Sequence, residues 1–151
     1  MSEITILRKP AEEMDDLDQK FDLVYLDPPF GLQRDFNMVE KDGREKGFSD
    51  SWKSFDDYID WYAEILNKCY SRLGDHGWIY AHNNFIGNAL VLSKVNSTVR
   101  DSFYTNISWK RSGPKNNIKN GWGNIVDSIM VLQKGKPYFE EGSLNSFHSN
   151  Y

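Results

Sequence analysis

Residues 21–30 read Phe21-Asp22-Leu23-Val24-Tyr25-Leu26-Asp27-Pro28-Pro29-Phe30, and this stretch decides the expected fold. Its first six residues are mostly apolar, and the prolines that follow cannot donate hydrogen bonds within a sheet. Such a run is typical of a strand buried on both faces of a parallel sheet. The sequence therefore predicts a strand over 21–26. Residues 27–30 then lie at its carboxyl end, which is where open α/β sheets bind ligands.

Helix and strand patterns alternate in the rest of the chain. Residues 31–53 are polar and contain three glycines, so they are expected to form a long loop. A helix is predicted to begin after Ser54, which forms a capping-box pattern with Asp57, and to end at Gly74. Further strands are predicted over 78–81, 103–109 and 128–132, with a helix over about 85–95. This order indicates an α/β protein whose last two strands are antiparallel.

The composition is that of an ordinary globular domain. The chain has 151 residues, of which 39% are hydrophobic and 26% charged, so one domain with a real core is expected. Its single cysteine, Cys69, lies on the apolar face of the predicted helix and is expected to be a core residue. The N-terminus lacks a signal-peptide layout, and no segment is apolar enough to suggest a membrane span, so a cytoplasmic location is expected. The three histidines form no metal-ligand pattern with Cys69, so no metal site is expected.

The charge of the chain is unevenly distributed. The net charge is −4, which by itself argues against a nucleic-acid-binding protein. However, residues 107–126 contain no acidic side chain while they carry four basic ones, Lys110, Arg111, Lys115 and Lys119. A local basic strip of this kind can bind phosphates even on an acidic protein. The alternative is a solvated loop whose charges only maintain solubility.

The Asp-Pro-Pro-Phe segment suits a reaction at a weak amine nucleophile. The exocyclic amino nitrogen of adenine or cytosine attacks poorly because its lone pair is delocalised into the ring. The Asp27 carboxylate and a backbone carbonyl near Pro28 can each accept one of its N–H bonds and free the lone pair. The rigid backbone of Pro28 and Pro29 presents carbonyls in a fixed frame, and Phe30 offers a face on which an extruded base can stack. The alternative is a strand that simply ends in an Asp-Pro turn.

These residues resemble the amino-methyltransferases of DNA that use S-adenosyl-L-methionine (AdoMet). The signature of that family is Asp, Asn or Ser followed by Pro-Pro and an aromatic residue, and Asp27-Pro28-Pro29-Phe30 matches it. The similarity covers about residues 20–140 and includes the aromatic segment 48–52, Arg72 with the glycine step over 73–79, the segment 106–110 and residues 134–139. Asp at the first signature position is more typical of adenine-N6 enzymes than of cytosine-N4 enzymes.

The resemblance implies a Rossmann-like methyltransferase sheet with helices on both faces. It also implies AdoMet as the methyl donor, with Asp27 in contact with it, and double-stranded DNA with a flipped target base as the substrate. The basic strip would then bind DNA together with Trp109 and Trp122, although Trp109 fits a packing role under the loop equally well. Two alternatives stay open. One is methylation of cytosine N4 or another amino group, and the other is a remnant that binds DNA or a partner without catalysis.

Departures from the family pattern limit this expectation. Val126-Asp127 stands where the family usually has His-Glu, and the family's AdoMet loop, Asp-Pro-Phe-x-Gly-x-Gly, is absent. Residues Gly121-Trp122-Gly123 lie in the basic segment and follow no predicted strand, so they do not replace that loop. We therefore expect residues 1–139 to form only the catalytic, target-base half of such a domain, followed by a polar tail over 140–151. An exposed strand edge would then require a dimer, a C-terminal half or a partner chain to cover it. The sequence leaves the recognition site and the oligomeric state open.

Overall fold

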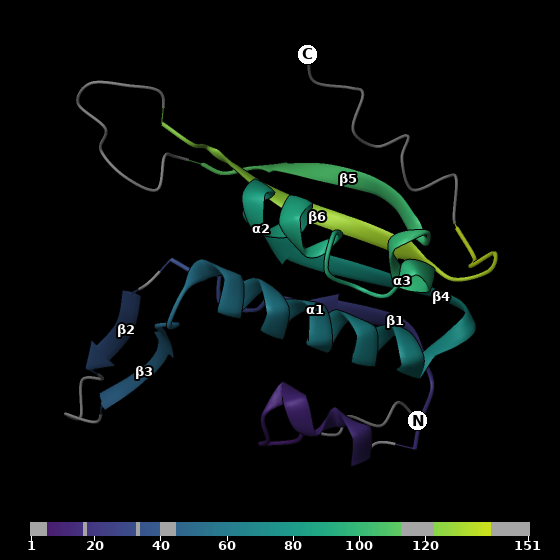
Figure 1. The fold of residues 1–151 in the computed structure, drawn as a ribbon, viewed down its shortest axis with the longest axis horizontal. Helices are drawn as coiled ribbons and strands as arrows, with labels where there is room; N and C mark the ends of the chain where they lie inside the picture. Colours follow the sequence, from purple (N-terminus) through teal and green to yellow (C-terminus); the bar gives the residue numbers. More distant parts are fainter. Residues whose placement is uncertain (1–5, 17, 33, 40–44, 113–122, 140–151) are drawn as a thin grey trace.

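A computed structural model describes residues 6–16, 18–32, 34–39, 45–112 and 123–139 of the chain (Figure 1). For residues 15–16, 34–39 and 45–49 only the backbone is described. The elements, in chain order, are η1 (Ala11–Asp16), β1 (Phe21–Leu26), β2 (Arg34–Val39), β3 (Glu45–Asp50), α1 (Phe55–Arg72), β4 (Leu73–Asn83), α2 (Phe85–Val91), α3 (Ser97–Arg100), β5 (Phe103–Lys110) and β6 (Val126–Gln133). The predicted α/β class and the predicted strand over 21–26 are confirmed.

The central sheet has four strands in the order β1-β4-β6-β5. Strands β1 and β4 are parallel, whereas β6 is antiparallel to both of its neighbours. The prediction that the last two strands are antiparallel is therefore confirmed. The register pairs Leu26 with Ala81, so the chain leaves β1 at Asp27 beside His82 on β4. This pairing places the Asp-Pro-Pro-Phe segment at the carboxyl ends of two parallel strands.

Helix α1 begins at a side-chain cap and ends at a change in backbone conformation. The Ser54 side chain caps its first turn by accepting a hydrogen bond from the backbone N–H of Asp57 at 3.1 Å, as the sequence predicted. Such a cap typically stabilises a helix by about 1 kcal/mol. The helix ends at Arg72 because Leu73 takes an extended conformation (φ −71°, ψ 136°) and starts β4. The helix therefore ends just before Gly74, close to the predicted position, but an ordinary residue entering a strand stops it and not the glycine.

The core lies between α1 and one face of the sheet. Seven α1 residues at helical spacing are buried, namely Tyr58, Ile59, Tyr62, Ala63, Ile65, Leu66 and Cys69. The core role predicted for Cys69 is confirmed, and burial raises the pKa of its thiol to about 12. None of the helices in the described ranges is both long enough and apolar enough to cross a membrane.

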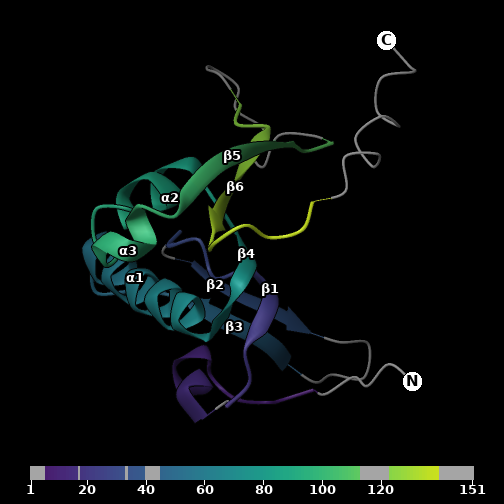
Figure 2. The same cartoon turned by 90° about the vertical axis from the view of Figure 1, so that its right-hand side faces the viewer.

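The helices of the described residues cover only one face of the sheet. Figure 2 shows α1, α2 and α3 together on one side of the strands. On that side Ile79 and Ala81 of β4 are fully buried, whereas on the other face Leu23 and Tyr25 of β1 are 58% and 56% exposed. The expectation of helices on both faces is thus met on one face only, and β1 is not buried on both faces. Strand β1 is an edge of the central sheet with one largely exposed face, on which the Tyr25 hydroxyl lies 3.1 Å from Nδ1 of His82.

The segment predicted as a long loop over 31–53 contains a second sheet. Strands β2 and β3 pair antiparallel from Arg34 opposite Asp50 to Val39 opposite Glu45, and they stand apart from the central sheet (Figure 1). The loop prediction was therefore wrong for these residues. Pairing in a two-stranded ribbon depends on backbone hydrogen bonds, which a polar sequence can form as well as an apolar one, so the polarity of this segment was misleading. The hairpin directly follows the Asp-Pro-Pro-Phe segment and returns the chain to it at Asp50.

Candidate active site

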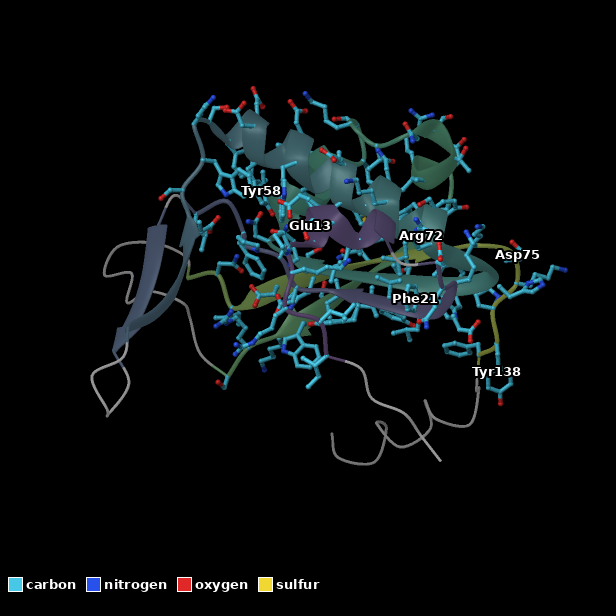
Figure 3. The ribbon with its side chains drawn as sticks, turned by 90° about the horizontal axis from the view of Figure 1, so that it is seen from below. Glu13, Phe21, Tyr58, Arg72, Asp75 and Tyr138 are labelled. Carbon is cyan, nitrogen blue, oxygen red and sulfur yellow. The ribbon has the colours of Figure 1, made fainter. Side chains whose placement is uncertain are left out.

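The Asp-Pro-Pro-Phe segment lies at the carboxyl end of β1, as the sequence predicted. The Asp27 side chain is 56% exposed, and its Oδ1 lies 3.3 Å from Nδ1 of His82 at the end of β4. Tyr58, which contacts the same segment, lies at the hairpin end of the sheet in Figure 3, whereas Phe21 and Asp75 lie at the opposite end. The candidate site is therefore an open edge where a carboxylate faces solvent beside a histidine.

Side chains from three elements hold the backbone that follows Asp27 and Pro28. The Tyr58 hydroxyl donates to the carbonyl of Pro29 at 2.8 Å, and the Asn84 amide donates to the carbonyl of Phe30 at 2.9 Å. The next two backbone groups, the N–H groups of Gly31 and Leu32, donate to the carboxylate of Asp50, at 2.9 and 2.8 Å, respectively. Every residue from 29 to 32 therefore has a main-chain group fixed by a side chain. This arrangement fixes the path of the loop in the way that a preorganised site requires.

Asp50 is the most deeply buried member of this group. Its side chain is fully buried, and besides the two backbone N–H groups it accepts a hydrogen bond from Nε1 of Trp52 at 3.0 Å. A buried carboxylate is tolerated when several donors replace its hydration, and here three donors do so. Asp50 ends β3, so the hairpin is the element that carries this carboxylate back to the loop.

Tyr58 contributes a permanent hydrogen-bond donor. Burial, together with the charge of nearby Asp50, raises the pKa of Tyr58 to about 12 against the opposing effect of a hydrogen bond from Asn83. The Asn83 amide donates to the Tyr58 oxygen at 2.5 Å, so the hydroxyl proton is left for the carbonyl of Pro29. The ring also fixes the shape of the loop. A Cβ atom on Gly31, which has a φ of +66°, would lie 2.6 Å from the Tyr58 ring, so only glycine fits at this position.

The groups that remain open are those the sequence assigned to the chemistry. Among the described residues, no donor bonds the carbonyl of Pro28, and the exposed carboxylate of Asp27 lies one residue before it. A carboxylate and a carbonyl at adjacent residues can accept the two N–H bonds of one amino group. The Phe30 ring is partly buried and meets the ring of His82 edge to face at 5.4 Å between centroids. The stacking role predicted for Phe30 stays a prediction.

The predicted DNA-binding residues are only partly placed by the structure. Lys115, Lys119 and Trp122 lie outside the described residues. Trp109 is 58% exposed and Lys110 is exposed, both at the end of β5. Arg111 is different because its Nη1 lies 2.6 Å from Oδ2 of the buried Asp127, so part of its charge is engaged within the chain. A role of these residues in DNA binding stays a prediction.

Sequence reasoning missed most of the residues that support the site. Asp50, Tyr58 and His82 were given no role there. For Asn83 and Asn84, which follow a predicted strand, the sequence favoured a helix N-cap over a substrate contact. Asn84 does cap α2, accepting a hydrogen bond from the backbone N–H of Gly87 at 2.8 Å, and its amide nitrogen separately bonds Phe30. One sequence signal was available, because Asp50 lies in the aromatic segment 48–52 that already resembled the family. The described residues contain no cluster of three side chains suited to holding a metal ion.

Comparison with known proteins gives a family and several partial relatives. The model of a family described as DNA methylase matches residues 21–151. The chain is similar to the type II methyltransferase M.EcaI of Enterobacter cloacae, with 28% identity over 123 residues, which is 80% of this chain and 26% of that protein. It is also similar to the DNA adenine methyltransferase YhdJ of Escherichia coli (strain K12), with 22% identity over 116 residues, 77% of this chain and 35% of that protein. The crystal structure of an M1.HpyAVI–SAM complex aligns with 85% of this chain and 52% of its own, at 13% identity and a TM-score of 0.46. The chain thus spans about a quarter to a third of the two curated relatives.

Proposed function

This chain belongs to the DNA methylase family, and we propose that it is the catalytic half of an enzyme that methylates the N6 amino group of adenine in DNA. The proposal rests on a difference between residues 27–28 and residues 29–32 of the same loop. The carboxylate of Asp27 is exposed and the carbonyl of Pro28 has no hydrogen-bond donor among the described residues, while residues 29–32 beside them are fixed by Tyr58, Asn84 and Asp50. A pair of acceptors on a rigid backbone is what a weak amine nucleophile requires.

The proposed chemistry follows from the two acceptors. One N–H bond of the target amine is directed to a carboxylate oxygen of Asp27 and the other to the carbonyl of Pro28. Both hydrogen bonds draw electron density onto the nitrogen and favour a tetrahedral geometry, so that its lone pair can attack a methyl carbon. AdoMet would supply that methyl group as an activated electrophile. Phe30 would stack on the extruded base, which must leave the duplex to reach Asp27.

The residues of this chain fit only the reacting end of AdoMet. Asp27 is exposed at the strand end, where it could contact the cofactor, but residues 1–151 contain no glycine loop of the family's form. The groups that grip AdoMet are therefore proposed to come from a C-terminal half, a partner chain or a second copy. A groove of about 270 Å³ runs beside β1, which ends the strand order, and its lining includes Phe21, Leu23 and Val24. A strand or helix from such a partner would pack against this edge and the open face of the sheet.

The proposed substrate is double-stranded DNA, with the basic strip as its contact. Trp109 and Lys110 are exposed at the end of β5. They are proposed to bind the DNA backbone together with Arg111, Lys115, Lys119 and Trp122. Residues 1–139 would form the catalytic unit and 140–151 a polar tail, and the enzyme would act in the cytoplasm. All of these points stay predictions.

The two alternatives make different predictions for the same assay. A cytosine-N4 enzyme would use the same acceptors, and the name of one relative, a DNA adenine methyltransferase, favours adenine. A non-catalytic remnant would bind DNA without methylating it, and the absent AdoMet loop favours that alternative. The intact arrangement around Asp27 favours catalysis, because DNA binding alone has no need of two open acceptors on a rigid loop.

The experiment is methyl transfer from radiolabelled AdoMet to duplex DNA, carried out with the chain joined to the half or partner that supplies the cofactor groups, followed by nucleoside analysis. We expect label in N6-methyladenine for the parent protein and none for Asp27→Ala. Label in N4-methylcytosine would support the cytosine alternative, and salt-dependent DNA binding without any label would support the remnant. Calorimetric titration of the chain with AdoMet should show weak binding or none. Micromolar binding by a monomer would contradict the proposal that a partner supplies the cofactor site.

A further inference from the structure

His82 lies between the open carboxylate of Asp27 and a buried carboxylate on the neighbouring strand. Its Nδ1 is 3.3 Å from Oδ1 of Asp27, and its Nε2 is 3.7 Å from Oδ2 of Asp127 on β6. The imidazole is thus flanked by one solvent-exposed and one buried acid. Its side chain is only 18% exposed, so the ring is held in this position by its surroundings.

The surroundings of Nε2, next to Asp127, indicate which nitrogen of the neutral His82 ring carries the proton. Asp127 is 3% exposed, and Nη1 of Arg111 lies 2.6 Å from its Oδ2. Among the described side chains, Nε2 of His82 is a buried nitrogen without a hydrogen-bond partner, and it lies 3.7 Å from the carboxylate of Asp127. A bare nitrogen lone pair directed at a buried carboxylate would be repelled, whereas an N–H would be attracted. Nδ1 also lies near a carboxylate, that of Asp27, but it has the Tyr25 hydroxyl at 3.1 Å as a donor, whereas no donor reaches Nε2 among the described residues. The geometry therefore favours the neutral ring with its proton on Nε2.

Nδ1 of His82, next to Asp27, is then the ring nitrogen that can accept a proton. With the proton on Nε2, Nδ1 presents a lone pair to the site. The Tyr25 hydroxyl, 3.1 Å away, can donate to this lone pair, and Oδ1 of Asp27 lies at 3.3 Å. Tyr25 is 56% exposed, so it connects Nδ1 with solvent. The charged and titratable groups that face the ring are thus Tyr25 from β1, Asp27 directly after β1, and Asp127 from β6, which is paired with Arg111. The ring of Phe30 meets the imidazole edge to face.

From this geometry we infer that His82 is a positioning residue that receives, at Nδ1, the proton that Asp27 takes from the target amine. The inference rests on the proposed function. As the amine nitrogen forms its bond to the methyl carbon, one of its N–H bonds breaks and the electron pair stays on nitrogen. The proton passes to Oδ1 of Asp27 and then to Nδ1 of His82. The resulting imidazolium faces the carboxylates of Asp27 and Asp127, and it returns to the neutral form by releasing the proton to water beside Tyr25.

The first test determines by NMR which nitrogen of the His82 ring is protonated, and it does not require an active enzyme. Long-range ¹H–¹⁵N NMR of the histidine rings in the purified chain should show neutral His82 with its proton on Nε2. Asp27→Asn should shift the Nδ1 signal of His82, because an amide would then donate to that lone pair. His76, which lies at the other end of β4 with its Nδ1 near the backbone N–H of Lys136, is the internal control and should not change. A His82 ring with its proton on Nδ1 would overturn the inference.

The second test asks whether the ring takes up a proton during methyl transfer. His82→Ala should lower kcat by about a hundredfold, the ordinary size of a proton-transfer contribution, with little change in KM for DNA. Added imidazole should restore part of the missing rate, which a purely structural role would not allow. The matched control is His76→Ala on the same strand, which should keep full activity.

The outcomes separate this inference from the proposed function. Full activity of His82→Ala, or a decrease that imidazole leaves unchanged, would overturn the role of His82 while the methyltransferase assignment stands. A protein that stays inactive when the groups that bind AdoMet are present would overturn the proposed function and this inference together.

Discussion

The loop that leaves β1 has two parts with opposite properties. Residues 29–32 are fixed by Tyr58, Asn84 and the buried Asp50, which contact their backbone groups at 2.8–2.9 Å. Immediately before them, Asp27 has an exposed carboxylate with His82 beside it, and the carbonyl of Pro28 has no hydrogen-bond donor among the described residues. The fixed part uses its polar groups for structure, and the open part keeps its polar groups for a ligand. Changes in the open part should therefore affect chemistry, and changes in the fixed part should affect stability first.

The largest effect is expected at Asp27. Asp27→Ala should reduce methyl transfer by at least about a hundredfold, because one of the two positioned acceptors is removed. Its urea midpoint should match that of the parent protein, since the side chain is more than half exposed. Methylation within about tenfold of the parent rate would contradict the assignment of Asp27. A large decrease in stability would contradict the distinction between the open and fixed parts.

The next largest effect is expected at Asp50, in the fixed part. Asp50→Ala leaves three donors without an acceptor, the buried N–H of Gly31 and the partly buried donors of Leu32 and Trp52, and should lower the free energy of unfolding by about 3 kcal/mol. Equilibrium unfolding in urea measures this change. Asp56→Ala, which removes an exposed carboxylate from the first turn of α1, is the matched control and should cost much less. Equal decreases in the two variants would show that Asp50 does not hold the loop.

Tyr58 should give a smaller effect with a characteristic pH dependence. Tyr58→Phe removes the donor to the carbonyl of Pro29 and should cost about 1 kcal/mol at neutral pH. The pKa of Tyr58 is raised to about 12 from 10, so the folded state resists ionisation that the unfolded chain undergoes. Parent stability should therefore be unaffected by this group below pH 10 and fall as the pH rises from 10 to about 12.

The control for this prediction is an exposed tyrosine. Tyr104 on β5 is 61% exposed, and its ring meets Trp78 at the sheet and not the loop. Tyr104→Phe should therefore keep the alkaline destabilisation that Tyr58 causes, and Tyr58→Phe should reduce it. Urea midpoints measured across the alkaline range would show the difference. An identical alkaline profile for the parent protein and Tyr58→Phe would contradict the prediction.

The smallest effects concern the basic strip, far from both parts of the loop in sequence. Replacing Lys110, Arg111, Lys115 and Lys119 by Ala should weaken DNA binding and lower the log–log salt slope by about 0.9 for each DNA phosphate that is no longer neutralised. Arg111→Ala alone should change the slope less than Lys110→Ala, because Arg111 is paired with Asp127. Binding measured by fluorescence anisotropy at several salt concentrations tests both points. An unchanged slope in the quadruple variant would indicate that the basic strip is only a solvated loop and does not contact DNA.

Local patterns in the sequence determined the main elements and the position of the reactive segment. An apolar run ended by prolines predicted β1 and placed Asp27 at its carboxyl end, and Ser54 with Asp57 predicted the start of α1. These predictions succeeded because strand burial, proline chemistry and helix capping each depend on residues within a few positions of one another. The β2–β3 hairpin was missed because its pairing involves the backbone and leaves little trace in side-chain type.

Only the tertiary structure decided which residues support the reactive segment. Asp50, Tyr58 and Asn84 lie between 18 and 54 positions from the backbone groups they bond, and no local pattern relates them. His82 meets Asp27 because β1 and β4 pair in one particular register, and it meets Asp127 because β6 pairs on the other side of β4. A shift of one residue in either pairing would turn these side chains to the opposite face. Register and long-range packing are cooperative properties of the whole fold, and for that reason the sequence identified the carboxylate of the site while the structure identified what holds it.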